Sequence, residues 1–264
     1  MTLMKGNKSI KALQKKMLDS IRKADIYFEF FEKESNFVAG ISGGFDSLVM
    51  VDLIAHYKDK YLKNVNFFAL FVENGLKPLK NPEMVRNFVE ERGFSFHIIK
   101  DTETADNILQ KKKPFNPCFI CSRKRRKILL EFASSVQSHR VLLAHNLDDV
   151  IETLLLNIFY SREISTMMPI QPLFQGRYFI VRPLSLIERN LIMKYALALG
   201  ISEKLEGTCT FENSNKRKLI RDYLMTLYKI DPRIHTNLKH SLFNCNFDFL
   251  WCKYKNEKQQ IHSV

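Results

Sequence analysis

The chain has 264 residues, of which 45% are hydrophobic and 26% are charged, a balance that excludes a disordered chain and indicates a folded globular protein. It contains no apolar run long enough to span a bilayer, and its first residues lack the apolar core of a signal peptide, so we expect a cytoplasmic protein without membrane contact. The formal net charge of +13 favours a polyanionic partner, although a lysine-rich, solvated surface explains that charge equally well.

Apolar periodicity predicts an amphipathic basic helix over residues 8–24, followed by strands that alternate with helices. The expected strands are 37–41, 65–72, 94–99 and 141–144, and the expected helices are 81–92, 121–137 and 148–160. Residues 101–117 are expected to form a polar, lysine-rich connection. Residues 168–174 and 178–184 are expected to form a hairpin or two extended segments, followed by helices at 187–199, 213–229 and 232–243.

This alternation predicts an α/β fold with a doubly wound, mostly parallel, Rossmann-like sheet, whose ligand site lies at the C-terminal ends of the strands. We expect an N-terminal helix in residues 1–30, a nucleotide-binding α/β domain in 31–185 and a C-terminal helical region in 186–264.

The stretch SGGFDS, residues 42–47, lies between an apolar strand and an apolar helix. Adjacent glycines allow a tight turn whose N–H groups, with those of the helix start, point at one anion. A carboxylate there repels phosphate, which indicates a bridging Mg²⁺ or a capping role. The alternative is a glycine turn that caps an ordinary helix. The residues expected to bind the nucleotide are Ser42, Gly43, Gly44, Asp46 and Ser47.

The stretch resembles the SGGxDS loop of the PP-loop ATP pyrophosphatase superfamily. That resemblance implies binding of ATP and Mg²⁺, adenylation of a carbonyl oxygen, and release of pyrophosphate, with Asp46 as a catalytic residue. The stretch lacks the lysine of the P-loop and the third glycine of the dinucleotide fingerprint.

A second polar stretch, HNLDD at residues 145–149, follows the strand expected at 141–144. His145 and Asp149 are therefore candidates for the same cleft, where a carboxylate can hold Mg²⁺ or meet a ribose. For Asp148, capping of the following helix is the alternative.

Five cysteines, an odd number, argue against a disulfide framework and favour metal or redox chemistry. Cys118 and Cys121 form a C-x-x-C at an expected loop-to-helix junction, where the helix dipole and nearby arginines favour thiolates. Such a pair is half of a zinc site, a redox pair, half of an iron-sulfur site, or without function. Cys209 is a third candidate that spacing alone does not join to the pair, and Cys245 and Cys252 are assigned no chemistry.

The segments CFICSRKRRKILLEFA and AHNLDDVIETLLLNIFY resemble two motifs of the tRNA 2-thiocytidine synthetases, and RPL at 182–184 and the later cysteine with the basic stretch NSNKRKLIRDYL continue the match. The resemblance covers residues 37–245. It implies that Cys118, Cys121 and Cys209 ligate a 4Fe-4S cluster with one open iron and are catalytic.

Three positions depart from the family pattern. Glu212 stands where a further cysteine is common, Ala144 replaces a glycine, and Leu147 replaces a polar residue. A three-cysteine site remains compatible with all three.

Basic side chains near these motifs are candidates for contact with RNA phosphates, with a solvated helix face as the alternative. They are Arg123, Arg126, Lys216, Arg217, Lys218 and Arg221.

The resemblance implies an ATP-dependent tRNA sulfurtransferase that adenylates a base carbonyl oxygen, expected to be at C2 of an anticodon-loop cytidine, and replaces that oxygen with sulfur. It also implies tRNA as partner, a cysteine desulfurase or sulfide as sulfur donor, and a homodimer. Two adenylating rivals remain: a lysidine synthetase, which shares the motif ETLLL, and a uridine thiolase. The non-enzyme rival is a basic RNA-binding iron-sulfur module.

Overall fold

The computed structural model describes residues 2–110, 117–201, 207, 209, 211 and 216–251, with side chains from residue 10 onward. The chain forms two compact units, residues 1–217 and 218–264, and each is described by itself. The three-part division predicted at residues 30 and 185 stays a prediction.

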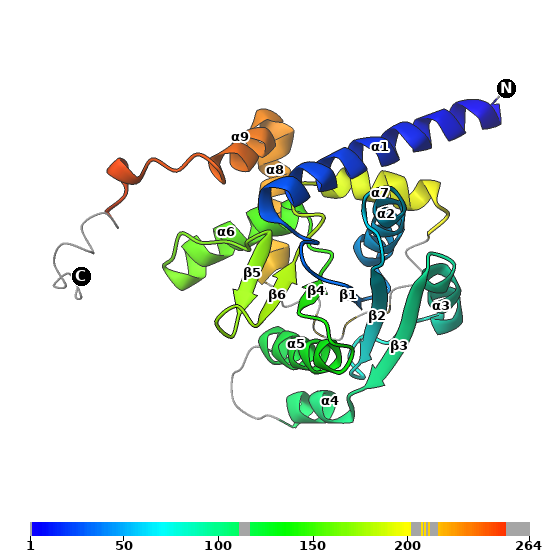
Figure 1. Ribbon diagram of the computed structural model, residues 1–264. Helices are drawn as coiled ribbons and strands as arrows, with labels where there is room; N and C mark the ends of the chain where they lie inside the picture. The colour runs from blue at the N-terminus through cyan, green and yellow to red at the C-terminus, as the bar shows by residue number, and fades with distance from the viewer. Residues whose placement is uncertain are drawn as a thin grey trace. The chain divides into compact units, whose positions relative to one another are not determined.

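The first unit is built on a sheet whose six described strands lie in the order β3-β2-β1-β4-β6-β5 (Figure 1). These strands are β1 (Asn36–Ile41), β2 (Asn66–Glu73), β3 (Phe94–Lys100), β4 (Arg140–Leu142), β5 (Ile170–Leu173) and β6 (Tyr178–Val181). Neighbouring strands run parallel, except that β5 and β6 form an antiparallel hairpin. The winding direction reverses between β1 and β4, so the C-terminal ends of these two strands border the crevice where ligands bind in such sheets. The predicted doubly wound, mostly parallel sheet is confirmed.

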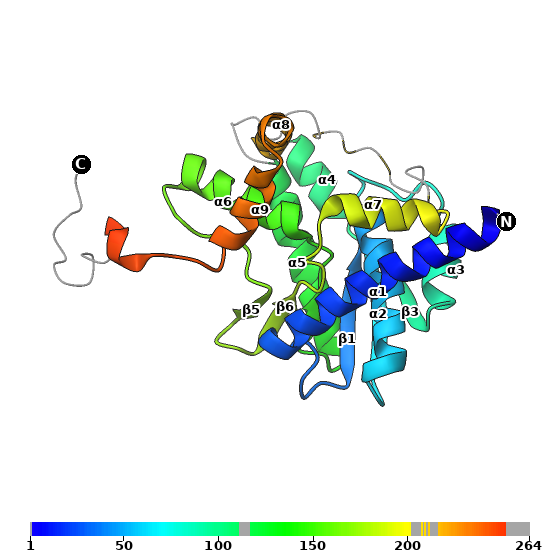
Figure 2. The ribbon, with the colours of Figure 1, turned by 90° about the horizontal axis from the view of Figure 1, so that it is seen from above.

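Helices cover both faces of this sheet (Figures 1 and 2). On one side lie α1 (Thr2–Phe28), α2 (Phe45–Tyr61), α3 (Pro82–Glu90) and α7 (Arg189–Ala198), and on the other lie α4 (Thr102–Leu109) and α5 (Pro117–Ser135). Side chains of β1 alternate between the two sides: Phe37 and Ala39 belong to the apolar cluster around α2, and Val38 belongs to the cluster around α5. Apolar runs buried on both faces explain why the strands read as continuous hydrophobic stretches.

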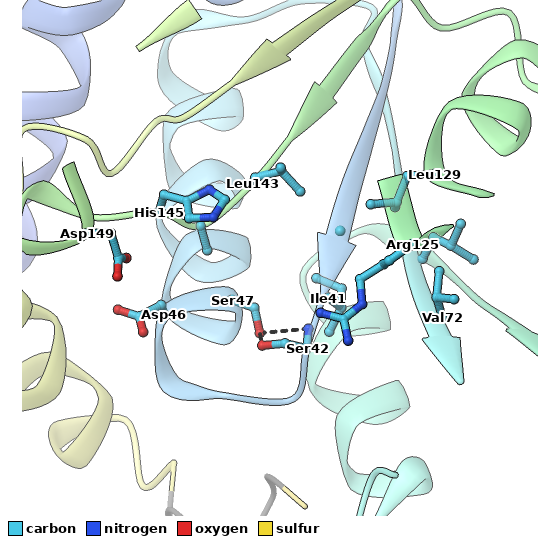
Figure 3. Close-up of a pocket in the computed structure, with 13 residues that line it drawn as sticks. Ile41, Ser42, Asp46, Ser47, Val72, Arg125, Leu129, Leu143, His145 and Asp149 are labelled. Atoms are coloured by element: carbon cyan, nitrogen blue, oxygen red, sulfur yellow. Dashed lines mark hydrogen bonds between the residues drawn. The ribbon is translucent and has the colours of Figure 1, made fainter. Parts of the chain in front are cut away.

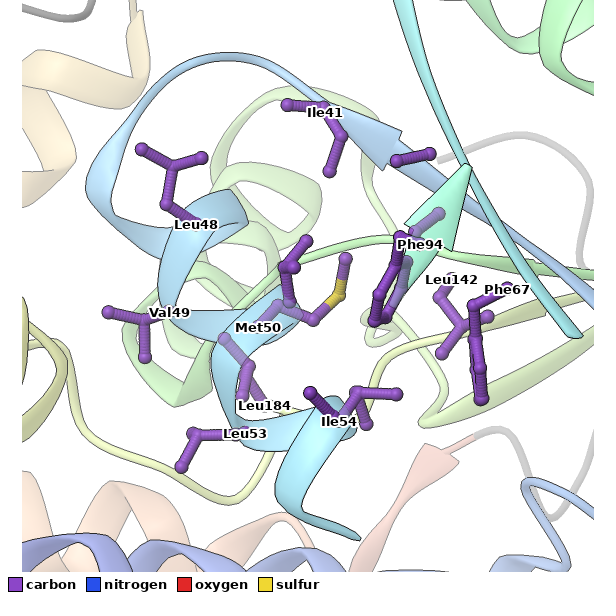
Figure 4. Close-up of a cluster of buried hydrophobic side chains, with 14 of the residues drawn as sticks. Ile41, Leu48, Val49, Met50, Leu53, Ile54, Phe67, Phe94, Leu142 and Leu184 are labelled. Atoms are coloured by element: carbon purple, nitrogen blue, oxygen red, sulfur yellow. The ribbon is translucent and has the colours of Figure 1, made fainter. Parts of the chain in front are cut away.

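Helix α2 is buried along most of its length (Figure 4). Leu48, Met50 and Ile54 are at most 1% exposed and pack with side chains of β2, β3 and β4. Burial on all sides fixes the position of the helix, and therefore of the loop that enters it, against the C-terminal end of β1.

Helix α1 packs onto the first unit through Met17 and Ile21, which are fully buried. Its Gln14 amide donates a hydrogen bond of 2.6 Å to the Tyr195 hydroxyl of α7, and that hydroxyl donates to Asp52 of α2. The predicted basic N-terminal helix is confirmed and serves as a packing element.

The connection predicted for residues 101–117 is wrong over Thr102–Leu109, which form α4, and residues 111–116 of that prediction lie outside the described part of the chain. The Asp101 carboxylate caps this helix by accepting the backbone N–H of Thr104 at 3.3 Å, and Ile108 is buried. Helix α5 also begins earlier than predicted, at Pro117, because proline is favoured in the first turn of a helix. The two cysteines therefore lie in the first turns of a helix.

The second unit contains most of α8 (Lys216–Ile230), followed by α9 (Arg233–Ser241) and a short 3-10 turn at Phe247–Phe249. The helices predicted at 213–229 and 232–243 are confirmed, although residues 213–215 lie outside the described part of the chain. None of the described helices combines the length and apolarity needed to cross a membrane.

Candidate active site

The loop between β1 and α2 forms the first part of the site (Figure 3). Gly43 has a φ of 80°, in the left-handed region that glycine adopts without strain. The Ser47 hydroxyl accepts the Ser42 backbone N–H at 3.2 Å, and the Ser42 hydroxyl accepts the Gly44 N–H at 3.2 Å. Gly44 is the N-cap of α2 and supplies no side-chain cap. The helix start thus presents backbone N–H groups to an external anion.

A pocket of about 220 Å³ opens beside this loop. Five of the seven predicted nucleotide-binding residues line it: Ser42, Asp46, Ser47, His145 and Asp149. Gly43 and Gly44 form the turn next to it. Its opposite wall is apolar, formed by Leu70 and Val72 of β2, Leu129 of α5 and Leu143. A polar loop facing an apolar wall suits a ligand with a phosphate end and a flat ring end.

Asp46 and Asp149 lie on the same side of the pocket (Figure 3). The Asn146 amide donates to Asp46 at 2.9 Å. Asn146 and Asp149 also form a capping box at the start of α6 (Leu147–Ser161), in which each side chain accepts the other residue's backbone N–H. One amide therefore links the helix after β4 to the helix after β1.

Asp149 is the hub of an ion-pair network that sequence patterns did not reveal. Its Oδ1 atom lies 2.8 Å from Arg189 and 3.5 Å from Arg217, and Arg189 also pairs with Glu152 at 2.9 Å. Glu152 is 1% exposed, so its charge requires these cations. Asp148 accepts the backbone N–H of Arg189 at 2.8 Å, which gives it a structural role.

The predicted RNA-binding residues lie in different settings. Arg123 and Arg126 are exposed on α5, whereas Arg217 is held by Asp149 and by Thr153. The Lys216 ammonium lies 4.2 Å from the centre of the Tyr160 ring. Lys218 and Arg221 belong to the second unit. Contact of all six with RNA stays a prediction.

The three predicted cysteine ligands line a second pocket, of about 210 Å³. Cys118 and Cys121 reach it from α5, and Cys209 reaches it from the segment before α8. That segment lies close against residue 78: a Cβ atom on Gly207 would lie 2.1 Å from the Pro78 carbonyl oxygen, so only glycine fits. The close approach explains how a cysteine 88 positions after Cys121 in the sequence reaches the same pocket. Glu212 and Cys252 lie outside the described residues.

Two nitrogen donors surround Cys121. The amide of Asn74, which is 1% exposed at the end of β2, donates to its sulfur at 3.0 Å, and Arg125 donates to the same sulfur at 3.6 Å. Burial and the neighbouring thiols of Cys209 and Cys121 raise the pKa of Cys118. A cationic occupant of this pocket would bind the three sulfurs as thiolates, because a thiol must lose its proton to act as a metal ligand. No three cysteine, histidine or acidic side chains in the described residues converge tightly enough to hold a single metal ion.

His145 follows β4, and within the described chain its Nδ1 atom is buried without a hydrogen-bond partner. Burial lowers the pKa of His145 to about 4, and the Arg182 cation contributes to the same effect. The imidazole is therefore neutral at pH 7. A neutral imidazole has one nitrogen that can accept a hydrogen bond from a ligand.

This depressed pKa predicts a loss of stability in acid. The unfolded chain binds a proton at His145 below its ordinary pKa of 6.5, and the folded chain does so only near 4. The free energy of unfolding therefore falls as the pH drops from 6.5 to 4, by about 1–3 kcal/mol from this residue. We expect His145→Gln to reduce the difference between urea midpoints at pH 7 and pH 4.5, and the exposed control His240→Gln to leave it unchanged. Equal differences in parent and His145→Gln would refute the assignment.

Comparisons with known proteins agree with this geometry. Residues 8–227 match the family described as the PP-loop domain. A tRNA-cytidine(32) 2-sulfurtransferase from Marinobacter nauticus is 30% identical over 224 residues, covering 83% of this chain and 72% of the relative. Another from Coxiella burnetii is 26% identical over 238 residues, covering 89% and 92%.

A solved structure shares the fold. The U34-tRNA thiolase NcsA from Methanococcus maripaludis, solved with its 4Fe-4S cluster, superposes with a TM-score of 0.72 at 22% identity and covers 88% of this chain and 78% of its own. The match with the PP-loop domain and the identity with the Marinobacter enzyme show that the chain belongs to the PP-loop family and, within it, to the tRNA-cytidine 2-sulfurtransferases.

Proposed function

We propose that the protein is an ATP-dependent tRNA sulfurtransferase that converts a cytidine of tRNA to 2-thiocytidine. The observation that carries the proposal is that one unit contains two pockets. The first is lined by the phosphate loop and by carboxylates, and the second is lined by three cysteines. The target base follows from the relatives, which are named for cytidine 32 of tRNA.

The first pocket supports binding of ATP. The start of α2 and the hydroxyls of Ser42 and Ser47 suit the phosphates, and the apolar wall suits the adenine. Asp46 lines the same pocket, and its carboxylate would hold Mg²⁺ together with the bound nucleotide. Asp149 is engaged by Arg189 and Asn146, so its part is to keep Asp46 and the loop in position.

The second pocket favours binding of a 4Fe-4S cluster by Cys118, Cys121 and Cys209. The three thiols line one pocket, and that pocket is large enough for more than a single ion. When bound, the cluster supplies an iron without a protein ligand at which sulfide can be held for transfer. Asn74 and Arg125 donate hydrogen bonds to the Cys121 sulfur, and the close approach of Gly207 to Pro78 brings Cys209 to the pocket.

The remaining details rest on the sequence. Four features stay predictions: binding of Mg²⁺, a cysteine desulfurase or free sulfide as the sulfur source, assembly into a homodimer, and a cytoplasmic location. Basic side chains of α5, Arg123 and Arg126, are exposed near the cysteine end of that helix and are available to RNA phosphates.

The test uses anaerobically purified protein with unmodified tRNA, ATP, Mg²⁺ and sulfide. We expect pyrophosphate release that depends on tRNA, and 2-thiocytidine in the nuclease-digested product. Radiolabelled lysine in the same reaction serves as the comparison, because a lysidine synthetase would incorporate the label. Pyrophosphate release with lysine in the product, or no ATP consumption at all, would contradict the proposal.

A further inference from the structure

Arg125 is the described residue that lines both pockets. It projects from α5 four residues after Cys121, one helical turn along the same face. Figure 3 shows its side chain reaching from α5 toward Ile41 and Ser42, at the phosphate-loop end of the first pocket. Its Nη2 atom lies 3.6 Å from the Cys121 sulfur. One guanidinium therefore lies between the nucleotide pocket and the cysteine pocket.

The charge of Arg125 is not neutralised by the described protein. The two lysines of the same basic run have acidic partners: Lys124 pairs with Glu103 at 3.2 Å, and Lys127 pairs with Glu131 at 3.5 Å. Arg125 is partly buried, yet no carboxylate of the described residues lies within ion-pair distance of it. A partly buried cation without a counter-ion is costly, which indicates that an anion occupies this position during function.

We propose that Arg125 is a catalytic residue of the sulfur-transfer step, where it binds the phosphate of the adenylated base and stabilises AMP as the leaving group. The inference rests on the proposed function. It adds to that function a group that acts after adenylation of the base, when sulfur replaces AMP. A planar guanidinium has five N–H donors, so it can bind a phosphate oxygen on one side while it donates to the Cys121 sulfur on the other.

The step balances without an oxidant or a reductant. Hydrogen sulfide anion, the sulfur co-reactant, forms a C–S bond at C2 of the adenylated cytidine with its own electron pair. The C2–O bond then breaks, and both of its electrons leave on the oxygen, which becomes a phosphate oxygen of AMP. The proton on sulfur passes to solvent. Negative charge builds on the AMP phosphate during this step, and a fixed cation there lowers the barrier.

The two half-reactions separate this role from simple binding of ATP. The first releases pyrophosphate and the second releases AMP with 2-thiocytidine, so a residue of the second step changes AMP release more than pyrophosphate release. The test compares Arg125→Met, Arg125→Lys and the control Lys127→Met, which removes an exposed cation from the same helix. The measurements are single-turnover pyrophosphate, AMP and 2-thiocytidine, together with iron content and melting temperature.

We expect Arg125→Met to keep its iron and its pyrophosphate release, to accumulate adenylated tRNA, and to form 2-thiocytidine about 100-fold more slowly than the parent. Arg125→Lys should recover part of that rate, because lysine keeps the positive charge but lacks the planar guanidinium with its two-pronged set of N–H donors. Lys127→Met should behave as the parent does. An equal fall in pyrophosphate and 2-thiocytidine, loss of iron, or a thiolation rate equal to that of Lys127→Met would overturn the inference. A parent protein that releases no pyrophosphate would instead overturn the proposed function.

Discussion

Replacing Cys209 with serine should abolish sulfur transfer and leave adenylation intact. Cys209 lines the cysteine pocket, whereas the phosphate loop is built from β1 and α2 and does not include it. Replacing a residue that only hydrogen-bonds to a metal ligand lowers activity by about 10- to 100-fold. Replacing a ligand itself should lower activity more, so we expect 2-thiocytidine formation to fall by at least ~100-fold. Iron and acid-labile sulfide should fall from about four of each per chain to well below that value.

Cys245→Ser is the matched control. Cys245 is an exposed cysteine of the second unit, and its sulfur contacts the Ser241 carbonyl oxygen. This variant should keep its iron, its pyrophosphate release and its thiolation rate. If Cys209→Ser retains iron at the parental level, or if both variants lose iron equally, the three-cysteine site is refuted.

The parts of the site that sequence predicted are local ones. The strand, the turn at Gly43 and the helix start are encoded within a dozen consecutive residues, and the cysteine pair lies within one turn of α5. Helix α4 was missed because it has only eight residues and few apolar ones. A polar segment of that length is hard to distinguish from a loop without knowing that Asp101 caps it and Ile108 is buried.

The parts that sequence did not predict depend on contacts between distant segments. Asn74 meets a sulfur 47 residues later in the chain, and Arg189 meets Asp149 from 40 residues away. Arg125 is one of five consecutive basic residues, and nothing in that run distinguishes the one that lies between the pockets. Such roles follow from which strands lie side by side, which only the fold determines.

Asp46→Asn should remove the ATP-dependent step while preserving the fold. The substitution keeps the size of the side chain, and its amide oxygen can still accept the Asn146 hydrogen bond, which is 2.9 Å long in the parent. It removes the negative charge that the proposed Mg²⁺ requires, so we expect pyrophosphate release to fall by about 100- to 1000-fold. The melting temperature should stay close to that of the parent.

The sign of the effect on nucleotide binding distinguishes a metal ligand from a residue that merely lines the pocket. Without Mg²⁺, a carboxylate at this position repels the phosphates, so Asp46→Asn should bind metal-free ATP at least as tightly as the parent does. With Mg²⁺, the parent should gain affinity and the variant should not. The control is Asp59→Asn, an exposed aspartate at the far end of the same helix, which should match the parent in both conditions. Equal stimulation of parent and Asp46→Asn by Mg²⁺ would show that Asp46 does not hold the metal, and the carboxylate would then act only through Asn146 on the start of α6.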